Sequence, residues 1–86
     1  MALSLDQVQE FTFNYRDQVI LATYRFTREN ENGDPIRAGQ IWGVINLKWG
    51  VSSETFKYSE GENILKLSKS AIEEHLKSEI ISFIEK

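Results

Sequence analysis

Alternating apolar and polar residues mark three strands in this chain, because successive side chains of a strand point to opposite faces. The alternation is clearest over residues 11–15; residues 19–28 are rich in β-branched and aromatic residues, and residues 41–49 separate into two faces when read with period two. The first two segments predict an antiparallel hairpin closed by the two-residue turn Arg16-Asp17, with Phe13 opposite Ile20. In this register one face of the hairpin is apolar and the other is mixed, as in a sheet that is covered on one side only.

Two shorter segments, Thr55–Tyr58 and Ile64–Leu67, predict a further hairpin around residues 59–63, where Gly61 can serve the turn. Residues 29–40 contain an Asn-Gly pair and an Asp-Pro pair, and they predict the main loop.

A helix is predicted at the C-terminus. Ser70 followed by Glu73 has the form of a capping box, and Ser68 is a rival N-cap. Apolar residues then recur at helical spacing. They are Ile72, Leu76, Ile80, Phe83 and Ile84. Near the N-terminus, Ser4 and Gln7 also have capping-box spacing, so a short helix can begin there.

Together these elements predict an α+β fold in a single domain that spans residues 1–86. We expect an antiparallel sheet of four to five strands with the amphipathic C-terminal helix packed on one face. The sequence leaves open which face the helix covers.

Composition narrows the classes of function. The 86-residue chain is 41% hydrophobic and 27% charged, with a net charge of −3, which weighs against a basic nucleic-acid-binding surface. The absence of cysteine excludes disulfides, thiolate nucleophiles and cysteine-based zinc sites. No apolar run is long enough to span a membrane, and the first residues lack the features of a secretory signal. We therefore expect a cytoplasmic protein that does not associate with membranes.

No residue pattern indicates catalysis. The single histidine, His75, has only Glu79 at helical pairing distance, which is an ordinary surface interaction. The serines lie in no Gly-x-Ser-x-Gly motif, and the glycines form no phosphate-binding loop. We expect no catalytic residue, no cofactor and no metal ligand, and hence a non-enzymatic protein. An active site completed by a second chain is a possibility on which the sequence is silent.

Surplus apolar residues predict a protein-binding surface. Val19, Leu21, Trp42 and Val44 fall on strand faces opposite to the main apolar sets, and Ile81 lies outside the helix stripe. Contiguous exposed apolar patches mark contact sites, and tryptophan is enriched among interface anchors. These five residues are the predicted contacts of a protein-interaction or regulatory module that binds another protein or a second copy of itself.

Two alternatives stay open. In the first, the N-terminal residues Leu3, Leu5 and Val8 fold back over this patch and make it part of the core. In the second, sheet aromatics and arginines bind RNA or DNA. The nucleic-acid contacts would be Tyr24, Arg25, Arg28 and Trp42.

The two tryptophans are expected to differ. Trp49 shares its strand face with Ile45 and predicts core packing, whereas Trp42 is the candidate interface anchor. Gly43 leaves a gap on the core face that Phe83 of the helix can fill.

Overall fold

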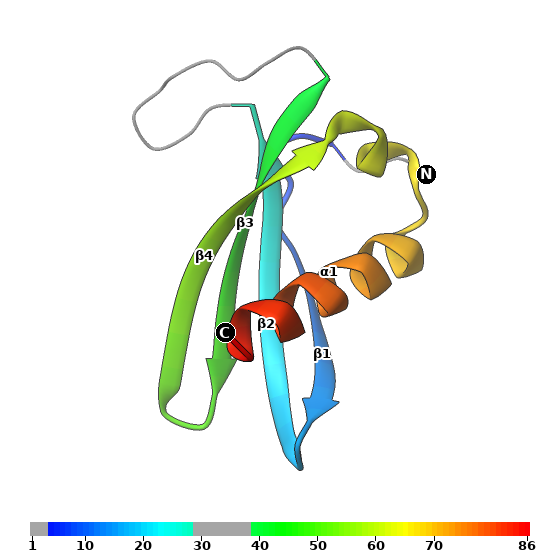
Figure 1. Cartoon of the computed structure of the whole chain (residues 1–86). Coiled ribbons are helices and arrows are strands. Elements are labelled where there is room, and N and C mark those ends of the chain that lie inside the picture. The colour runs from blue at the N-terminus through cyan, green and yellow to red at the C-terminus, as the bar shows by residue number, and fades with distance from the viewer. Residues whose placement is uncertain (1–3, 29–38) are drawn as a thin grey trace.

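The computed structural model describes residues 4–28 and 39–86 and confirms the α+β architecture (Figure 1). Four strands form one antiparallel sheet in the order β1-β2-β3-β4. The strands are β1 (Gln9–Tyr15), β2 (Gln18–Thr27), β3 (Gln40–Trp49) and β4 (Ser52–Gly61), and they are followed by the 3₁₀ helix η1 (Glu62–Lys66) and the helix α1 (Lys69–Ile84). The helix crosses one face of the sheet in front of β1 and β2 (Figure 1).

The hairpin of β1 and β2 has the predicted register, with Phe13 opposite Ile20. Arg16 and Asp17 form its turn with φ angles of 48° and 65°. Two-residue hairpin turns of type I′ need positive φ at both central positions, a conformation that matches the twist of the flanking strands. The aromatic alternation therefore determines the register even though Arg-Asp is not the favoured turn pair.

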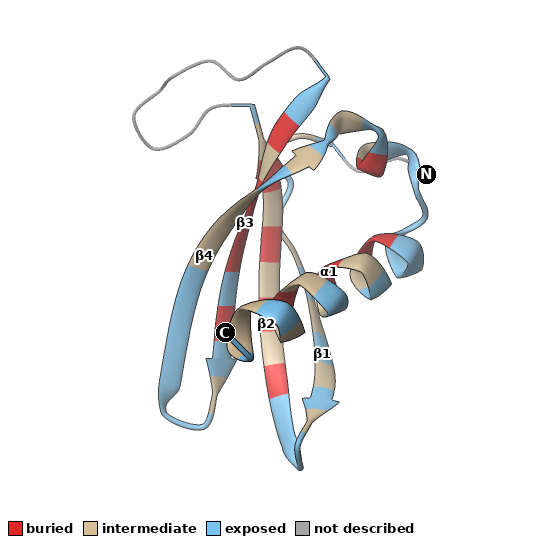
Figure 2. Cartoon of the chain, viewed as in Figure 1, coloured by how far each residue is buried: buried red, intermediate tan, exposed pale blue. Residues whose placement is uncertain are grey.

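The core lies between the sheet and α1 (Figure 2). Alternate residues of β2 and β3 enter it, and so do helix residues at a spacing of four. The buried set is Ile20, Ala22, Tyr24, Phe26, Ile41, Ile45, Leu47, Ile64, Ile72, Leu76 and Ile80. Trp49 is half-buried and packs against this cluster, as expected from its strand face.

Gly43 accommodates a different side chain from the one predicted. The ring of Tyr58, its cross-strand partner on β4, occupies the space where a Cβ would lie, and its nearest atom would be 2.4 Å away. Phe83 instead stacks on Phe56, with ring centroids 4.3 Å apart. The gap on the core face is therefore filled within the sheet and not from the helix.

The predicted strand at Ile64–Leu67 is wrong. The chain there forms η1, in which Ile64 is buried and Leu65 also packs against the core. Neighbouring residues of a strand point to opposite faces, so a strand would have turned one of the two away from the core. A 3₁₀ turn lets both contact it, and β4 consequently runs on to Gly61.

The short N-terminal helix is also absent from the described residues. Ser4 and Gln7 form one half of the predicted capping box, with the Ser4 amide donating to Gln7 Oε1 at 3.1 Å, while the Gln7 amide donates to the Ser4 main-chain carbonyl at 3.3 Å. However, Asp6 has a φ of 62° and its amide donates to the Phe26 carbonyl at 2.7 Å. A left-handed residue at this point ends the structure after one turn.

Helix α1 begins after Ser68, the second of the two predicted N-cap residues. Ser68 Oγ accepts a hydrogen bond from the Ala71 amide at 3.2 Å, so Ser68 and not Ser70 is the N-cap. Most of the loop predicted at 29–40 lies outside the described residues, as does Leu3. None of the described helices is long and apolar enough to cross a membrane.

Candidate interaction surface

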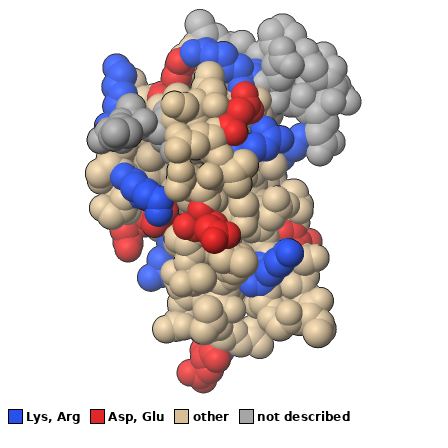
Figure 3. Space-filling view, turned by 180° about the vertical axis from the view of Figure 1, so that it is seen from behind, with Lys and Arg blue, Asp and Glu red and all other residues tan. Residues whose placement is uncertain are grey.

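The sheet face opposite α1 is called the open face here, because neither α1 nor η1 covers it (Figure 1). Strand alternation and the observed register define its members. They are Glu10, Thr12 and Asn14 of β1, Val19, Leu21, Thr23, Arg25 and Thr27 of β2, Trp42, Val44, Asn46 and Lys48 of β3, and Ser53, Thr55, Lys57 and Ser59 of β4. Figure 3 views the molecule from this side and shows mostly uncharged atoms with scattered charges of both signs.

Four of the five predicted contact residues lie on the open face, but they form two groups. Leu21 pairs across the sheet with Lys48, whereas Val44 pairs with Arg25. Leu21 and Arg25 are four residues apart on one strand, or about 13 Å. Polar Thr23 lies between them. The apolar patch is therefore divided into one group near the β1–β2 turn and one near the other end of the sheet.

Exposure separates these residues further. Val19 is 63% exposed, Leu21 and Trp42 are half-buried, and Val44 is only 8% exposed. The prediction that Val44 offers exposed apolar surface is therefore wrong. Ile81 is half-buried on α1, on the other side of the sheet, so it does not join the rest.

The N-terminal segment covers the open face only in part. Val8 and Val44 line a shallow hollow of about 80 Å³. Val8 is nevertheless 60% exposed, and Leu5 packs against the core. Val8 was not among the predicted contacts. Its sequence signal is the alternation of β1, which continues to residue 8 and assigns it to the open face.

The indole N–H of Trp42 is buried without a partner. The Nε1 atom is inaccessible to solvent and has no hydrogen-bond partner. A buried donor without a partner destabilises the folded state by roughly 1–3 kcal/mol. Trp42 is thus neither a well-satisfied core residue nor a fully exposed anchor.

The predicted nucleic-acid contacts do not converge. Tyr24 is 1% exposed on the helix side, and its hydroxyl donates to Glu73 Oε2 at 3.0 Å, so its ring cannot stack on a base. Arg25 forms an ion pair with Asp6 at 3.3 Å, and Arg28 forms one with Glu62. Trp42 and Arg25 share the open face, but Tyr24 is wrong as a stacking residue because it faces the core.

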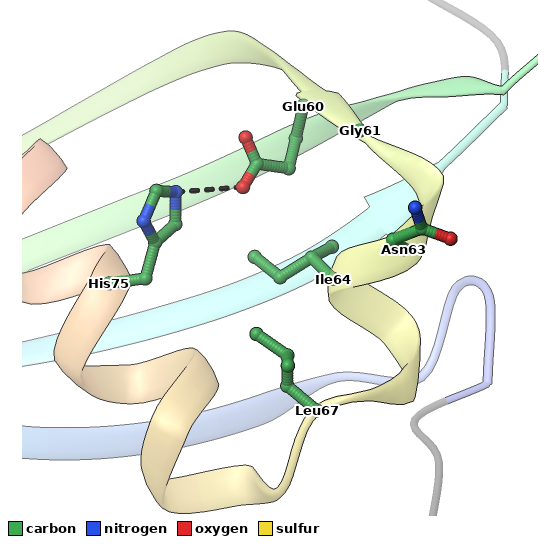
Figure 4. Close-up of a pocket in the computed structure, with 6 residues that line it drawn as sticks. All are labelled: Glu60, Gly61, Asn63, Ile64, Leu67 and His75. Carbon is green, nitrogen blue, oxygen red and sulfur yellow. Dashed lines mark ion pairs between the residues drawn. The ribbon is translucent and has the colours of Figure 1, made fainter.

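A second hollow, of about 280 Å³, lies where β4, η1 and α1 meet (Figure 4). Ile64 and Leu67 form its apolar wall, and Asn63 stands at its rim. His75 and Glu60 point toward each other beside it, with Nε2 2.7 Å from Glu60 Oε1. Glu60 is a partner that the sequence pattern missed, because β4 was expected to end at Tyr58.

No protein-family model, curated protein or solved structure matches this chain. Its function is therefore inferred from the geometry alone.

His75 lies between two carboxylates. Its Nε2 lies 3.9 Å from Glu79 Oε1 as well, and the approach to Glu60 meets the distance but not the angle of a hydrogen bond. Burial, together with the carboxylates of Glu60 and Glu79, raises the pKa of the nearby Tyr58 hydroxyl far above its ordinary value. Within residues 4–28 and 39–86, no serine hydrogen-bonds to His75 and no three acidic or histidine side chains are placed to hold a metal ion. The cluster thus joins α1 to β4.

Proposed function

We propose that this chain is a small non-enzymatic protein-interaction module that docks a partner protein on its open face. The observation that carries the proposal is a sheet face that neither helix covers and that retains an exposed valine, Val19, and the half-buried Leu21 and Trp42. Large aromatic and aliphatic side chains in such positions are typical of interface anchors. The proposal includes the cytoplasm as its location, since a chain without cysteine suits a reducing compartment.

The charges of the open face favour protein over nucleic acid. Arg25 is paired with Asp6 at 3.3 Å and Glu10 adds a negative charge to the same face, whereas Lys48 and Lys57 add positive charges, so the face carries both signs. Phosphate backbones are bound by basic residues that are not already paired with carboxylates. A surface of mixed charge fits the polar rim of a protein interface better.

The partner we infer is a different protein and not a second copy of this chain. The middle of the open face carries the polar row Thr23, Asn46 and Thr55, and Thr55 donates to Asn46 at 2.5 Å. Permanent homodimers bury more apolar surfaces that resemble a domain core. A divided patch with a polar centre is typical of partners that bind and release.

Site-specific photocrosslinking tests this proposal. A photoreactive residue at position 19 should give a discrete adduct with one partner in native cells, and one at the exposed position 78 of α1 should not. The purified partner should then bind the unmodified chain and lose affinity for Trp42→Ala. An adduct only between two copies of the chain, or equal adducts from both positions, would count against the proposal. So would a salt-dependent affinity for nucleic acid that requires Arg25 and Arg28.

A further inference from the structure

The outer edge of β4 presents main-chain groups for pairing. β4 is an edge strand of the sheet, and a two-residue turn at 50–51 joins it to β3. In such a hairpin the flanking pair, here Trp49 and Ser52, is hydrogen-bonded. At the far end the Glu62 amide donates to the Gly39 carbonyl at 2.8 Å, which has the same parity. Even-numbered residues of β4 therefore direct their N–H and C=O groups to β3, and odd-numbered residues direct theirs away from the sheet.

The outward-directed residues of β4 form an uninterrupted row. They are Ser53, Thr55, Lys57 and Ser59. The pairing of β4 with β3 runs without a bulge along the whole strand, and β4 contains no proline. Residues 52–55 are exposed whichever face of the sheet they lie on. An edge of this kind is a template for another strand.

The sequence of β4 is complementary to itself about Phe56. Two copies of β4 can pair antiparallel with Phe56 opposite Phe56, which also sets the outward-directed residues opposite one another. The other facing pairs are Ser53 with Ser59, Thr55 with Lys57, Glu54 with Tyr58, and Ser52 with Glu60. No like charges are opposite in this register. The two Phe56 rings meet at a non-hydrogen-bonded position, where the side chains of facing strands are closest.

The two neighbouring symmetric registers are less favourable. A register centred on Thr55 sets Phe56 opposite Glu54. A register centred on Lys57 sets Lys57 opposite Lys57 and Glu54 opposite Glu60. Aromatic pairs opposite each other stabilise a sheet, and like charges opposite each other destabilise it. The pattern of β4 therefore favours Phe56 as the centre.

An aromatic hollow adjoins Phe56 on the helix side of the sheet. Phe56 stacks on Phe83 of α1, with ring planes 11° apart, and both rings line a hollow of about 300 Å³ together with Tyr58. The hollow also carries charged side chains of both signs, Lys57, Glu79 and Lys86. In the register centred on Phe56, Glu54 faces Tyr58 of the second copy. Its carboxylate thus approaches a hollow with two cations and one carboxylate.

The opposite edge of the sheet offers less to a second copy. The hollow beside β1 is also lined by aromatic and charged side chains, namely Phe11, Phe13, Glu73, Glu74 and Lys77. However, β1 is shorter, and by the same parity only Glu10, Thr12 and Asn14 direct main-chain groups outward. The N-terminal half of α1 also extends past β1, whereas its C-terminal end stops short of β4 (Figure 1). Two copies joined through β1 would bring both helix overhangs to the joint.

We propose that two copies of this chain pair through β4 in the antiparallel register centred on Phe56. The two sheets then form one continuous sheet, and the two hollows meet where Phe56 and Phe83 of each copy lie. The two-fold axis is perpendicular to this sheet, so both open faces lie on the same side of it. The contact is separate from the open face, and the inference therefore goes beyond the proposed function.

Sedimentation of the purified chain tests the inference. Pairing along one strand with one aromatic cluster is a small contact compared with a permanent dimer. We therefore expect a reversible dimer with a dissociation constant on the order of 10–100 μM. The weight-average mass should rise from that of one chain toward that of two between about 1 μM and about 1 mM. A chain that stays monomeric at about 1 mM would overturn the inference.

Two charge variants at one position provide the matched comparison. Thr55→Lys and Thr55→Glu both lose the hydrogen bond to Asn46, but they set opposite charges across from Lys57 of the second copy. At low salt we expect Thr55→Lys to raise the dissociation constant of the dimer by about tenfold and Thr55→Glu to lower it by about threefold. The same two substitutions at Thr12, on the β1 edge, should leave it within about twofold.

Spin labels determine the register of the dimer. The chain contains no cysteine, so Ser53→Cys provides a single attachment site at an exposed position. In the register centred on Phe56, the two labelled positions are separated by about 20 Å along the joint. Registers centred on Thr55 and Lys57 would give about 13 Å and about 27 Å. A dominant separation near either of these values would overturn the register that we propose.

Three further outcomes would overturn the inference. They are the same response to Thr55→Lys and Thr55→Glu, an equal response to the Thr12 variants, and a dimer that Val19→Asp abolishes. Val19 lies on the open face of β2, two strands away from β4. Absence of the dimer therefore does not count as failure of the open-face proposal.

Discussion

At the scale of single residues, Gly43 and Tyr58 show how one position can determine the packing of two strands. They face each other across β3 and β4, and the Tyr58 ring occupies the space above the glycine. The hydroxyl of Tyr58 is buried without a hydrogen-bond partner, so the ring contributes to stability through its packing. A side chain at position 43 would have to displace it.

Gly43→Ala should therefore lower the free energy of unfolding by about 1–3 kcal/mol, the usual cost of overpacking a core. The new Cβ would lie 2.4 Å from the Tyr58 ring. Gly61→Ala is the matched control. A Cβ added at Gly61 would have no atom within 4 Å, and the backbone there is extended. Urea unfolding of both variants measures the difference. A Gly43→Ala variant as stable as Gly61→Ala would show that the ring moves aside at no cost.

Residue faces were predictable from the sequence, and residue exposure was not. Period-two alternation correctly placed Trp42 and Val44 on one face of β3 and Trp49 on the other. Yet Val44 is buried and Val8 is exposed. These exposures depend on how the chain before β1 lies over the sheet, and local periodicity carries no information about that contact.

At the scale of elements, hydrogen-bonded ends and turns decide where each element stops. The hydrophobic pattern determines the register of β1 with β2. A shift of the pairing by one residue would turn the aromatic side chains of β1 away from the core. Residues 64–67 failed as a predicted strand because a four-residue segment with three apolar residues cannot distinguish a strand from a helical turn. Only tertiary packing of Ile64 and Leu65 settled it.

The N-cap of α1 gives a prediction at this scale. Ser68→Ala removes the side chain that accepts the Ala71 amide, and it should lower the free energy of unfolding by about 1 kcal/mol. Ser70→Ala leaves that hydrogen bond in place and should cost much less. Thermal or urea unfolding of the two single variants checks the order. Equal losses would mean that Ser70 also caps the helix.

At the scale of the whole molecule, a two-layer arrangement leaves one sheet face without a second layer, and β1 and β4 are the two edge strands of the sheet. The α+β class followed from the order of the patterned segments, since a single amphipathic helix can cover only one face. The convergence of Glu60, Glu79 and His75 did not follow from the sequence, because it depends on how α1 crosses the sheet. Long-range crossing geometry has no local sequence signal.

The buried tyrosines make stability depend on alkaline pH. Burial raises the pKa of Tyr24 and Tyr58 well above the ordinary value near 10, and the carboxylates of Glu73 and Glu60 add to the effect. Above about pH 10 the unfolded chain loses tyrosine protons that the folded chain keeps. The folded state then binds more protons, so stability falls as pH rises, by up to about 1.4 kcal/mol per pH unit for each tyrosine.

Comparison with Tyr58→Phe isolates this effect from the titration of lysines. The variant should show a shallower fall in the free energy of unfolding between about pH 10 and pH 11.5, measured in urea at each pH. Identical slopes in the two proteins would mean that the Tyr58 hydroxyl titrates alike in the folded and unfolded chains.

The central claim is that the open face binds a partner protein, and the affinity of that partner for two charge variants tests it most directly. Val19→Asp introduces a carboxylate on the open face, and Ser78→Asp introduces the same group on the exposed side of α1. Calorimetric titration with the purified partner should show at least about tenfold weaker binding for Val19→Asp, and no more than about a twofold change for Ser78→Asp. Unchanged affinity for Val19→Asp, or a larger loss for Ser78→Asp, would contradict the account.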